Sequence, residues 1–358
     1  MEAILRLEKV SKAFGTQQVL EAFDLSVEEG EFVTLLGPSG CGKTTVLNLV
    51  AGFLRPDSGT IYLRGKPVND VITRKRQLGM VFQTWALFPH MNAFDNVAFG
   101  LRMQRKPKEQ IEKKVREMLD LVRMPSVSEK YPSQLSGGMR QRIALARGLA
   151  VEPSILLLDE PLSNLDAALR KEMQVELKRI HDQLRVTTVF VTHSQEEALV
   201  MSDRIAVMRG GKIIRIDVPS ELYHDPRSKF VCTFLGDANL FEGKVIEMSG
   251  STAKVQSGDL VLKALLRAPV SPGSGLSLAV RPERVSVQRE ASLSADNSIK
   301  ARIKEMVFTG NSITYYLDAA GRELVALEYQ KAAQAIPERG TEVVAEFDAK
   351  AFSILEAE

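Results

Sequence analysis

The amino-acid sequence predicts an α/β domain with a mostly parallel sheet, followed by a smaller all-β domain. Three observations support this fold class. Short apolar runs alternate with helical periods over the first two thirds of the chain, and a glycine-rich loop joins a strand to a helix near the amino terminus. From about Asp237 the sequence changes to short alternating runs broken by Gly, Ser and Pro. We therefore expect domains at 1–236 and 237–358.

Composition narrows the class of protein. With 47 basic and 45 acidic residues the formal charge is only +2, so no electrostatic footprint for nucleic acid is present. Two cysteines are too few for a disulfide framework, and the start MEAILRLEKV lacks the plan of a signal peptide. No apolar run approaches the ~20 residues that cross a bilayer. We expect a cytoplasmic protein. If it works at a membrane, we expect another chain to span the bilayer.

The predicted strands of the first domain cover residues 32–36, 155–158 and 187–192. Each is β-branched or apolar and is followed by a turn and then by a helical pattern, which favours a parallel sheet with ligands at the carboxyl ends of its strands. Between 94 and 150 the pattern is mostly helical. Behind Pro107 the apolar residues fall on one helix face, and they are Ile111, Val115, Met118, Leu119 and Val122.

The second domain contains a repeat. Residues 243–255 resemble 301–317, and residues 272–287 resemble 337–354 in the corresponding later places. Two copies of a five-strand unit are typical of a small OB-like barrel or a pair of them. The alternative is that strand-rich sequences resemble one another by composition alone.

The loop GPSGCGKTT follows a predicted strand and opens a predicted helix, which is the context that a phosphate-binding loop requires. Its glycines allow a tight turn of inward amides, and the helix amino end favours an anion. Lys43 can reach the β- and γ-phosphates of a nucleotide, the Thr44 hydroxyl can bind Mg²⁺, and the helix end favours a thiolate at Cys41. The expected nucleotide contacts in this loop, which would be ATP contacts if the nucleotide is ATP, are Gly37, Pro38, Ser39, Gly40, Cys41, Gly42, Lys43, Thr44 and Thr45.

Acidic and polar residues follow the other two predicted strands and the strand-like run LGMVF, 78–82. The run ILLLDEP ends in two carboxylates, which are costly in a core unless paired or bound to metal. We expect Asp159 to hold Mg²⁺ and Glu160 to orient and polarise the attacking water. Gln83 is expected to ligate Mg²⁺ or that water, and His193 to contact the γ-phosphate. The alternatives are strand-end acids that meet solvent, a surface glutamine and a structural histidine.

The segment LSGGMRQ, 135–141, places two glycines before a basic, apolar-striped helix. With the preceding motifs, in this order, the chain resembles the ABC transporter ATPases over residues 4 to about 236. The resemblance implies a P-loop NTPase domain with a helical subdomain at about 84–152, ATP and Mg²⁺ as cofactors, and Lys43, Gln83, Glu160 and His193 as catalytic residues. It also implies that Phe14 stacks on adenine and that Gln83, Ser136, Gly137, Gly138, Gln141 and Asp166, the last of the D-loop 163–166, contact ATP.

The same resemblance implies an assembly. The segment LSGGMRQ resembles the signature sequence of the family, which closes the ATP site of a second subunit. Since this chain holds one phosphate loop and one signature sequence, a head-to-tail homodimer is expected. Ser136 supplies a hydroxyl, the glycines supply bare amides, and the helix end supplies positive potential.

The tail resembles the TOBE domain of importers, through AVRPERV, 279–285, and FTGNSITYYL, 308–317. The runs FPHMNAFDNVAFGL and FLGDANLFEG are most similar to spermidine/putrescine importers. The expected function is therefore an ATP-hydrolysing subunit on the cytoplasmic face of the membrane, bound to permease subunits and indirectly to a solute-binding protein. Alternatives are import of ferric iron, sulfate, phosphonate or sugar, an exporter, and a soluble ATPase in DNA repair or translation. A coupling groove is expected at Trp85, Leu87, Phe88, Met91 and Phe94.

Overall fold

The computed structural model describes residues 3–292, 295–319, 321–330 and 337–356. The chain divides into two compact units, Met1–Pro219 and Ser220–Glu358. The change of sequence texture at Asp237 therefore lies inside the second unit, which begins with two short helices, α7 (Pro219–His224) and α8 (Lys229–Phe234). The limits 1–236 and 237–358 remain predictions.

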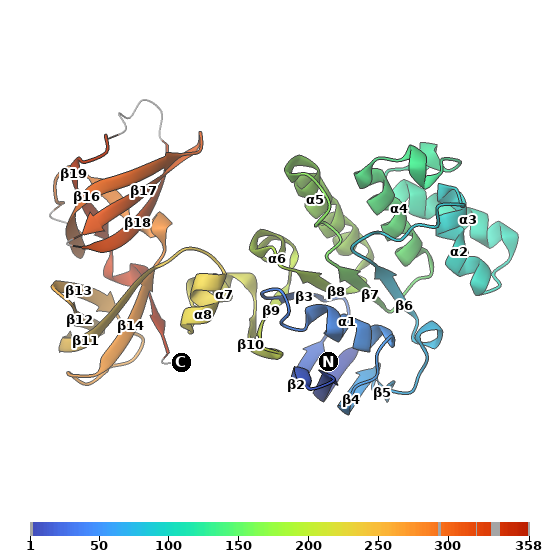
Figure 1. Cartoon of the computed structure of the whole chain (residues 1–358), viewed down its shortest axis with the longest axis horizontal. Helices are drawn as coiled ribbons and strands as arrows, with labels where there is room; N and C mark the ends of the chain where they lie inside the picture. Colours follow the sequence, from blue (N-terminus) through green and yellow to red (C-terminus); the bar gives the residue numbers. More distant parts are fainter. Residues whose placement is uncertain (1–2, 293–294, 320, 331–336, 357–358) are drawn as a thin grey trace. The chain divides into compact units, whose positions relative to one another are not determined.

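A six-stranded sheet forms the centre of the first unit (Figure 1). Its order is β10-β9-β3-β8-β7-β6, with every neighbouring pair parallel except β9 and β10. The three strands predicted from the sequence are confirmed as β3, β7 and β8. The bounds are β3 (Phe32–Leu36), β6 (Leu78–Val81), β7 (Ile155–Asp159), β8 (Thr187–Thr192), β9 (Arg204–Arg209) and β10 (Lys212–Asp217).

A second, antiparallel sheet lies in the same unit, and the sequence reading of the first domain as parallel missed it. Its order is β2-β1-β4-β5, formed by β1 (Leu5–Phe14), β2 (Gln17–Val27), β4 (Ser58–Leu63) and β5 (Lys66–Pro67). Helix α1 (Lys43–Ala51) shares one core with this sheet and with alternate residues of the central strands, among them Val33 and Leu157.

The opposite face of the central sheet packs on the remaining helices of the unit. Phe32 and Phe190 belong to a second hydrophobic core on this face, which also includes the buried side chains of the helical subdomain. The expected apolar face is confirmed, since Ile111, Val115, Met118 and Leu119 are buried on α3. The helices are α2 (Ala93–Met103), α3 (Lys108–Leu121), α4 (Gly137–Ala150), α5 (Ala167–Leu184) and α6 (Gln195–Met201), with 3₁₀ turns Thr73–Lys75, Pro125–Val127 and Pro132–Gln134.

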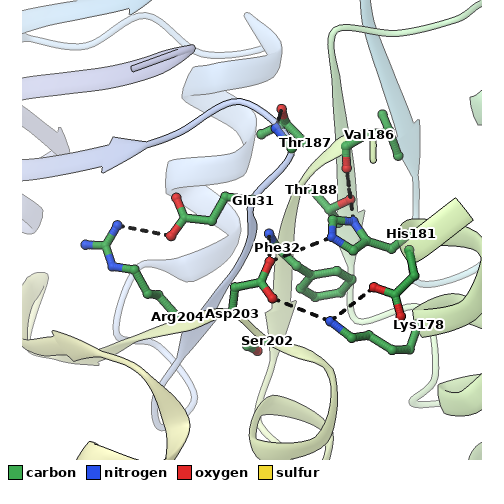
Figure 2. Close-up of polar contacts among 12 residues, drawn as sticks. Glu31, Phe32, Lys178, His181, Val186, Thr187, Thr188, Ser202, Asp203 and Arg204 are labelled. Carbon is green, nitrogen blue, oxygen red and sulfur yellow. Dashed lines mark hydrogen bonds and ion pairs between the residues drawn. The ribbon is translucent and has the colours of Figure 1, made fainter. Parts of the chain in front are cut away.

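A polar cluster attaches the carboxyl end of α5 to the central sheet (Figure 2). Asp203, which directly precedes β9, accepts a hydrogen bond of 2.9 Å from the backbone N–H of Phe32 and lies 3.5 Å from the Nζ of Lys178. The imidazole of His181 packs edge-on against the Phe32 ring and lies 3.1 Å from the carbonyl oxygen of Val186 through Nδ1. Helix α5, the start of β3 and the residue before β9 are thus fixed to one another at this point.

The second unit confirms the internal repeat. Its two five-stranded sheets have the orders β13-β12-β11-β14-β20 and β18-β17-β16-β19-β15, so corresponding strands hold corresponding places. The fifth strands are exchanged, because β15 pairs with β19 and β20 pairs with β14. The bounds are β11 (Asn239–Ser249), β12 (Thr252–Ser257), β13 (Leu260–Leu265), β14 (Gly275–Val280), β15 (Ser286–Gln288), β16 (Asn297–Phe308), β17 (Ser312–Ala319), β18 (Arg322–Tyr329), β19 (Glu342–Phe347) and β20 (Phe352–Leu355).

One buried arginine explains why α7 and α8 pack with the second unit. The guanidinium of Arg281 donates to the carbonyl oxygens of Cys232, Gly236, Asp237 and Tyr223, at 2.9 to 3.3 Å. These carbonyls lie near the carboxyl ends of both helices, where a cation is favoured. The arginine of the AVRPERV run therefore has a structural role in this unit.

Candidate nucleotide site at the sheet edge

The motifs predicted to bind ATP meet at one edge of the central sheet. The strand β3 runs directly into the glycine loop, and its last residue, Leu36, pairs in register with Thr192, the residue before His193. On the other side of β8, Asp159 pairs with Val191. Since these strands are parallel, their carboxyl ends share the edge where ligands bind in open α/β sheets.

The glycine loop has the geometry of an anion cradle. Gly40 and Gly42 have φ values of +80° and +101°, which favour glycine, and a Cβ on Gly42 would lie 2.7 Å from the side chain of Leu20. The Nζ of Lys43 donates to the carbonyl oxygens of Gly37 and Pro38 at 2.7 and 3.0 Å. The ammonium thus lies within the loop that is expected to surround the phosphates.

Cys41 differs from the sequence expectation. Its side chain is buried, and burial raises the pKa of the thiol, although the neighbouring charge of Lys43 acts in the opposite direction. The expectation of a favoured thiolate was wrong because it counted the helix end and omitted desolvation, which is the larger effect here.

The two carboxylates at the end of β7 have different surroundings. Asp159 accepts a hydrogen bond of 3.2 Å from the hydroxyl of Thr44. Burial raises the pKa of Asp159, the charge of Glu160 adds to the rise, and the Thr44 hydroxyl opposes it. The carboxylate of Asp159 and the hydroxyl of Thr44 are oxygen donors of the kind that Mg²⁺ prefers, so these two residues would fit a magnesium ion. Among the described residues, no group of three or more His, Cys, Asp or Glu side chains could hold a metal ion.

Glu160 is the centre of a polar cluster at the same edge. Its Oε2 lies 3.3 Å from the Nε2 of Gln83 and 3.3 Å from the Nδ1 of His193. The backbone of Glu160 is left-handed, with φ +43°, and its N–H donates to Val191 at 3.0 Å. A left-handed conformation is uncommon for a residue other than glycine and is often found at functional sites. The structure thus brings Gln83, Glu160 and His193 together, as the sequence predicted.

Two residues of the D-loop support this cluster, and sequence reasoning gave them no role of their own. The hydroxyl of Ser163 donates to the carbonyl oxygen of Glu160 at 2.9 Å and accepts from Gln83 at 3.3 Å. The side-chain amide of Asn164 donates to the carbonyl oxygen of Gln83 at 2.9 Å. The only signal for them was their position inside the SNLD run.

The signature segment lies apart from the phosphate loop in the same chain (Figure 1). No hydrogen bond between described residues joins the two. Ser136 caps α4 by accepting from the N–H of Met139 at 3.3 Å, and a Cβ on Gly138 would lie 2.9 Å from Leu169. Gly138 therefore also lets α4 pack closely on α5.

The remaining expected nucleotide contacts have different environments. The ring of Phe14 is 48% exposed at the end of β1, so it is free to stack on a planar ligand. Asp166 caps α5 by accepting from the N–H of Leu169 at 2.9 Å. Gln141 is 1% exposed, and neither atom of its amide has a hydrogen-bond partner. A contact between Gln141 and nucleotide would require that the surroundings of this side chain open.

Several residues expected to line a coupling groove pack into or against the interior, and the groove itself stays a prediction. Trp85 is 9% exposed and belongs to the core around the helical subdomain, and Leu87 and Phe94 pack against that core. The rings of Phe88 and Phe99 are in contact in a tilted arrangement, with their centroids 4.6 Å apart. Trp85 therefore contributes mainly to the interior of the subdomain.

Two family models match the chain. Residues 20–163 match the ABC transporter model and residues 278–355 match the TOBE domain model. The chain is 45% identical over 318 residues to the spermidine/putrescine import ATP-binding protein PotA of Aliivibrio fischeri, covering 88% of this chain and 85% of that protein. The chain belongs to the ABC transporter ATP-binding family. The protein of the same name from Rubrobacter xylanophilus is 42% identical over 355 residues, covering 98% of this ABC protein and 93% of the relative.

Solved structures agree with this assignment. This ABC protein is similar to cbiO1 from Clostridium perfringens, part of the ABC transporter complex cbiONQ, with TM-score 0.59 and 28% identity over 62% of this chain and 91% of that one. It is also similar to the ATP-binding cassette MJ0796, solved as a dimer in a post-hydrolysis state with ADP and Pi. The TM-score is 0.54 and the identity is 32%, over 60% of this chain and 98% of that chain. The chain is therefore an ATP-binding ATPase.

Within the part of the chain that the structure describes, no helix is both long and apolar enough to span a bilayer.

Proposed function

We propose that this chain is the ATPase subunit of an importer for a small polyamine, working as a homodimer on the cytoplasmic face of the membrane with permease subunits and a solute-binding protein. The assignment of the solute rests on the relatives, which carry the name spermidine/putrescine import protein and are 42 to 45% identical over most of both chains. The contact of Glu160 with Gln83 and His193 carries the assignment of the chemistry.

The roles of the residues follow from their positions. The loop of residues 37–45 surrounds the phosphates, and Lys43 exchanges its bonds to Gly37 and Pro38 for phosphate oxygens. Thr44, Asp159 and Gln83 would hold Mg²⁺, which when bound neutralises charge on the phosphates. Glu160 accepts a proton from the attacking water, because its carboxylate lies at the strand edge beside these groups. His193 and Gln83 hold that carboxylate in place.

The dimer supplies what one chain lacks. Within one chain the turn of residues 136–138 is separate from the phosphate loop, so a second copy must present its turn to the nucleotide. The amides and helix end of that turn would stabilise negative charge on the γ-phosphate, and Phe14 would stack on the adenine.

Replacing Glu160 tests the proposed chemistry. Glu160→Gln keeps the shape and the contacts of the side chain but removes the base, so hydrolysis should fall about 100-fold or more while ATP binding persists. The variant should accumulate as an ATP-dependent dimer, measured by sedimentation with and without ATP. Hydrolysis at the parent rate would contradict the assignment of Glu160.

Uptake by the complete transporter tests the proposed solute. The chain is purified with its permease, reconstituted with its solute-binding protein, and supplied with labelled spermidine, putrescine or sulfate. Uptake that depends on ATP should be seen with the polyamines. Uptake of sulfate alone would refute the solute assignment and leave the ATPase assignment intact.

A further inference from the structure

Trp85 is the one tryptophan in the sequence and follows Gln83 by two residues. Its side chain is buried beside two motif loops, yet none of the proposed catalytic roles belongs to it.

The indole contacts two motif segments at once. Its Nε1 donates to the carbonyl oxygen of Pro161, the residue after Glu160, at 3.3 Å. On the other side, a Cβ on Gly137 would lie 3.4 Å from Cη2 of the indole, and the guanidinium of Arg140 lies 5.4 Å from the ring centroid. The side chain therefore joins the amino end of α4 to the loop that carries Glu160.

The backbone at this position is constrained. Trp85 and Ala86 both have left-handed φ values, +61° and +43°, which are unfavourable for residues other than glycine. Arg147 of α4 donates to the carbonyl oxygens of both residues, at 3.0 and 2.8 Å. Helix α4 thus fixes the backbone of Trp85 and Ala86 through Arg147, near the end of the helix. It also contacts the indole ring near the start of the helix.

We propose that Trp85 is a positioning residue for ATP hydrolysis, which links the Ser136–Gly138 turn to the backbone that holds Glu160. When a second subunit engages that turn, the displacement of α4 reaches Pro161 through the indole and sets the carboxylate of Glu160 against the water. This inference rests on the proposed roles of Glu160 and of the turn.

Steady-state kinetics of Trp85→Phe test the link. The substitution keeps an aromatic ring but removes the N–H donor to Pro161, so kcat should fall about tenfold while KM for ATP stays within about twofold, because the phosphate loop does not contact Trp85. Val115→Ala is the matched control, since Val115 is buried in the same core but lies on α3. It should lower the melting temperature without changing kcat at a temperature where the variant is folded.

The intrinsic fluorescence of Trp85 provides a second measurement that leaves the indole in place. In Glu160→Gln, adding MgATP should change the emission, and Ser136→Arg in the same chain should abolish that change. Unchanged emission, a kcat of Trp85→Phe equal to that of the parent, or an equal loss in Val115→Ala would each overturn the inference. Parent-like hydrolysis by Glu160→Gln would instead contradict the proposed function, so the two failures are distinguishable.

Discussion

His181 shows how one buried side chain makes stability depend on pH. It is 2% exposed, and because the carbonyl of Val186 can only accept, Nδ1 carries the proton of the neutral ring and Nε2 faces Asp203 at 3.7 Å (Figure 2). Burial lowers the pKa of His181 below its ordinary 6.5, and the charge of Lys178 acts in the same direction. Asp203 and Asp182 act in the opposite direction with smaller effect.

The sign of the pH dependence follows from this pKa. The folded protein favours the neutral imidazole, so the contribution of His181 is complete above about pH 6.5 and is lost as the pH falls below that value. His181→Gln cannot protonate, and the difference in free energy of unfolding between parent and variant should shrink as the pH falls from 7 to 5. Urea unfolding across that range measures it. A difference that is constant, or that grows on acidification, would contradict the lowered pKa.

Among the elements, β6 and α4 approach each other unusually closely. A Cβ on Gly79 of β6 would lie 2.5 Å from the backbone oxygen of Gly148 of α4, a distance that side chains essentially never reach. The close approach matters because β6 leads to Gln83 and α4 begins at the signature turn. The separation of the two elements is therefore set by glycine on the strand.

Alanine substitutions at these two glycines should have unequal effects. Gly79→Ala must displace the backbone of α4 and should cost about 1–3 kcal/mol of unfolding free energy. In Gly148→Ala the atoms nearest to the new Cβ would be side-chain carbons of Leu156 and Val81, at 3.4 and 3.5 Å, which are ordinary contact distances. Because alanine also favours a helix interior, stability should be retained or rise by up to about 1 kcal/mol. Chemical unfolding of both variants gives the comparison, and equal losses would show that the approach is not limiting.

The sequence predicted those elements whose pattern is local. The strands β3, β7 and β8 and the meeting of Gln83, Glu160 and His193 followed from apolar runs that end in polar residues, because parallel strands share an edge. The exchange of β15 and β20 was not predictable, since a swapped strand and an unswapped strand have the same alternation.

Burial was also hard to predict from local pattern. The environments of Cys41 and Trp85 depend on segments distant in sequence, and the buried amide of Gln141 lies in a run that matches the family motif without indicating exposure. In each case the motif identified the residue, whereas the packing around it decided its solvent access.

For the whole molecule, the separation of the signature turn from the phosphate loop predicts that each ATP site combines two chains. Lys43→Ala removes the phosphate-loop ammonium, and Ser136→Arg blocks the turn, so each variant alone should form two defective sites and be inactive. In a mixed dimer one site receives both defects, and the other pairs an intact phosphate loop with an intact turn. Mixing the variants should therefore restore single-turnover hydrolysis, approaching half of the parent amplitude in those mixed dimers. A site contained within one chain would give no recovery although the dimers form, which sedimentation of the mixture would detect.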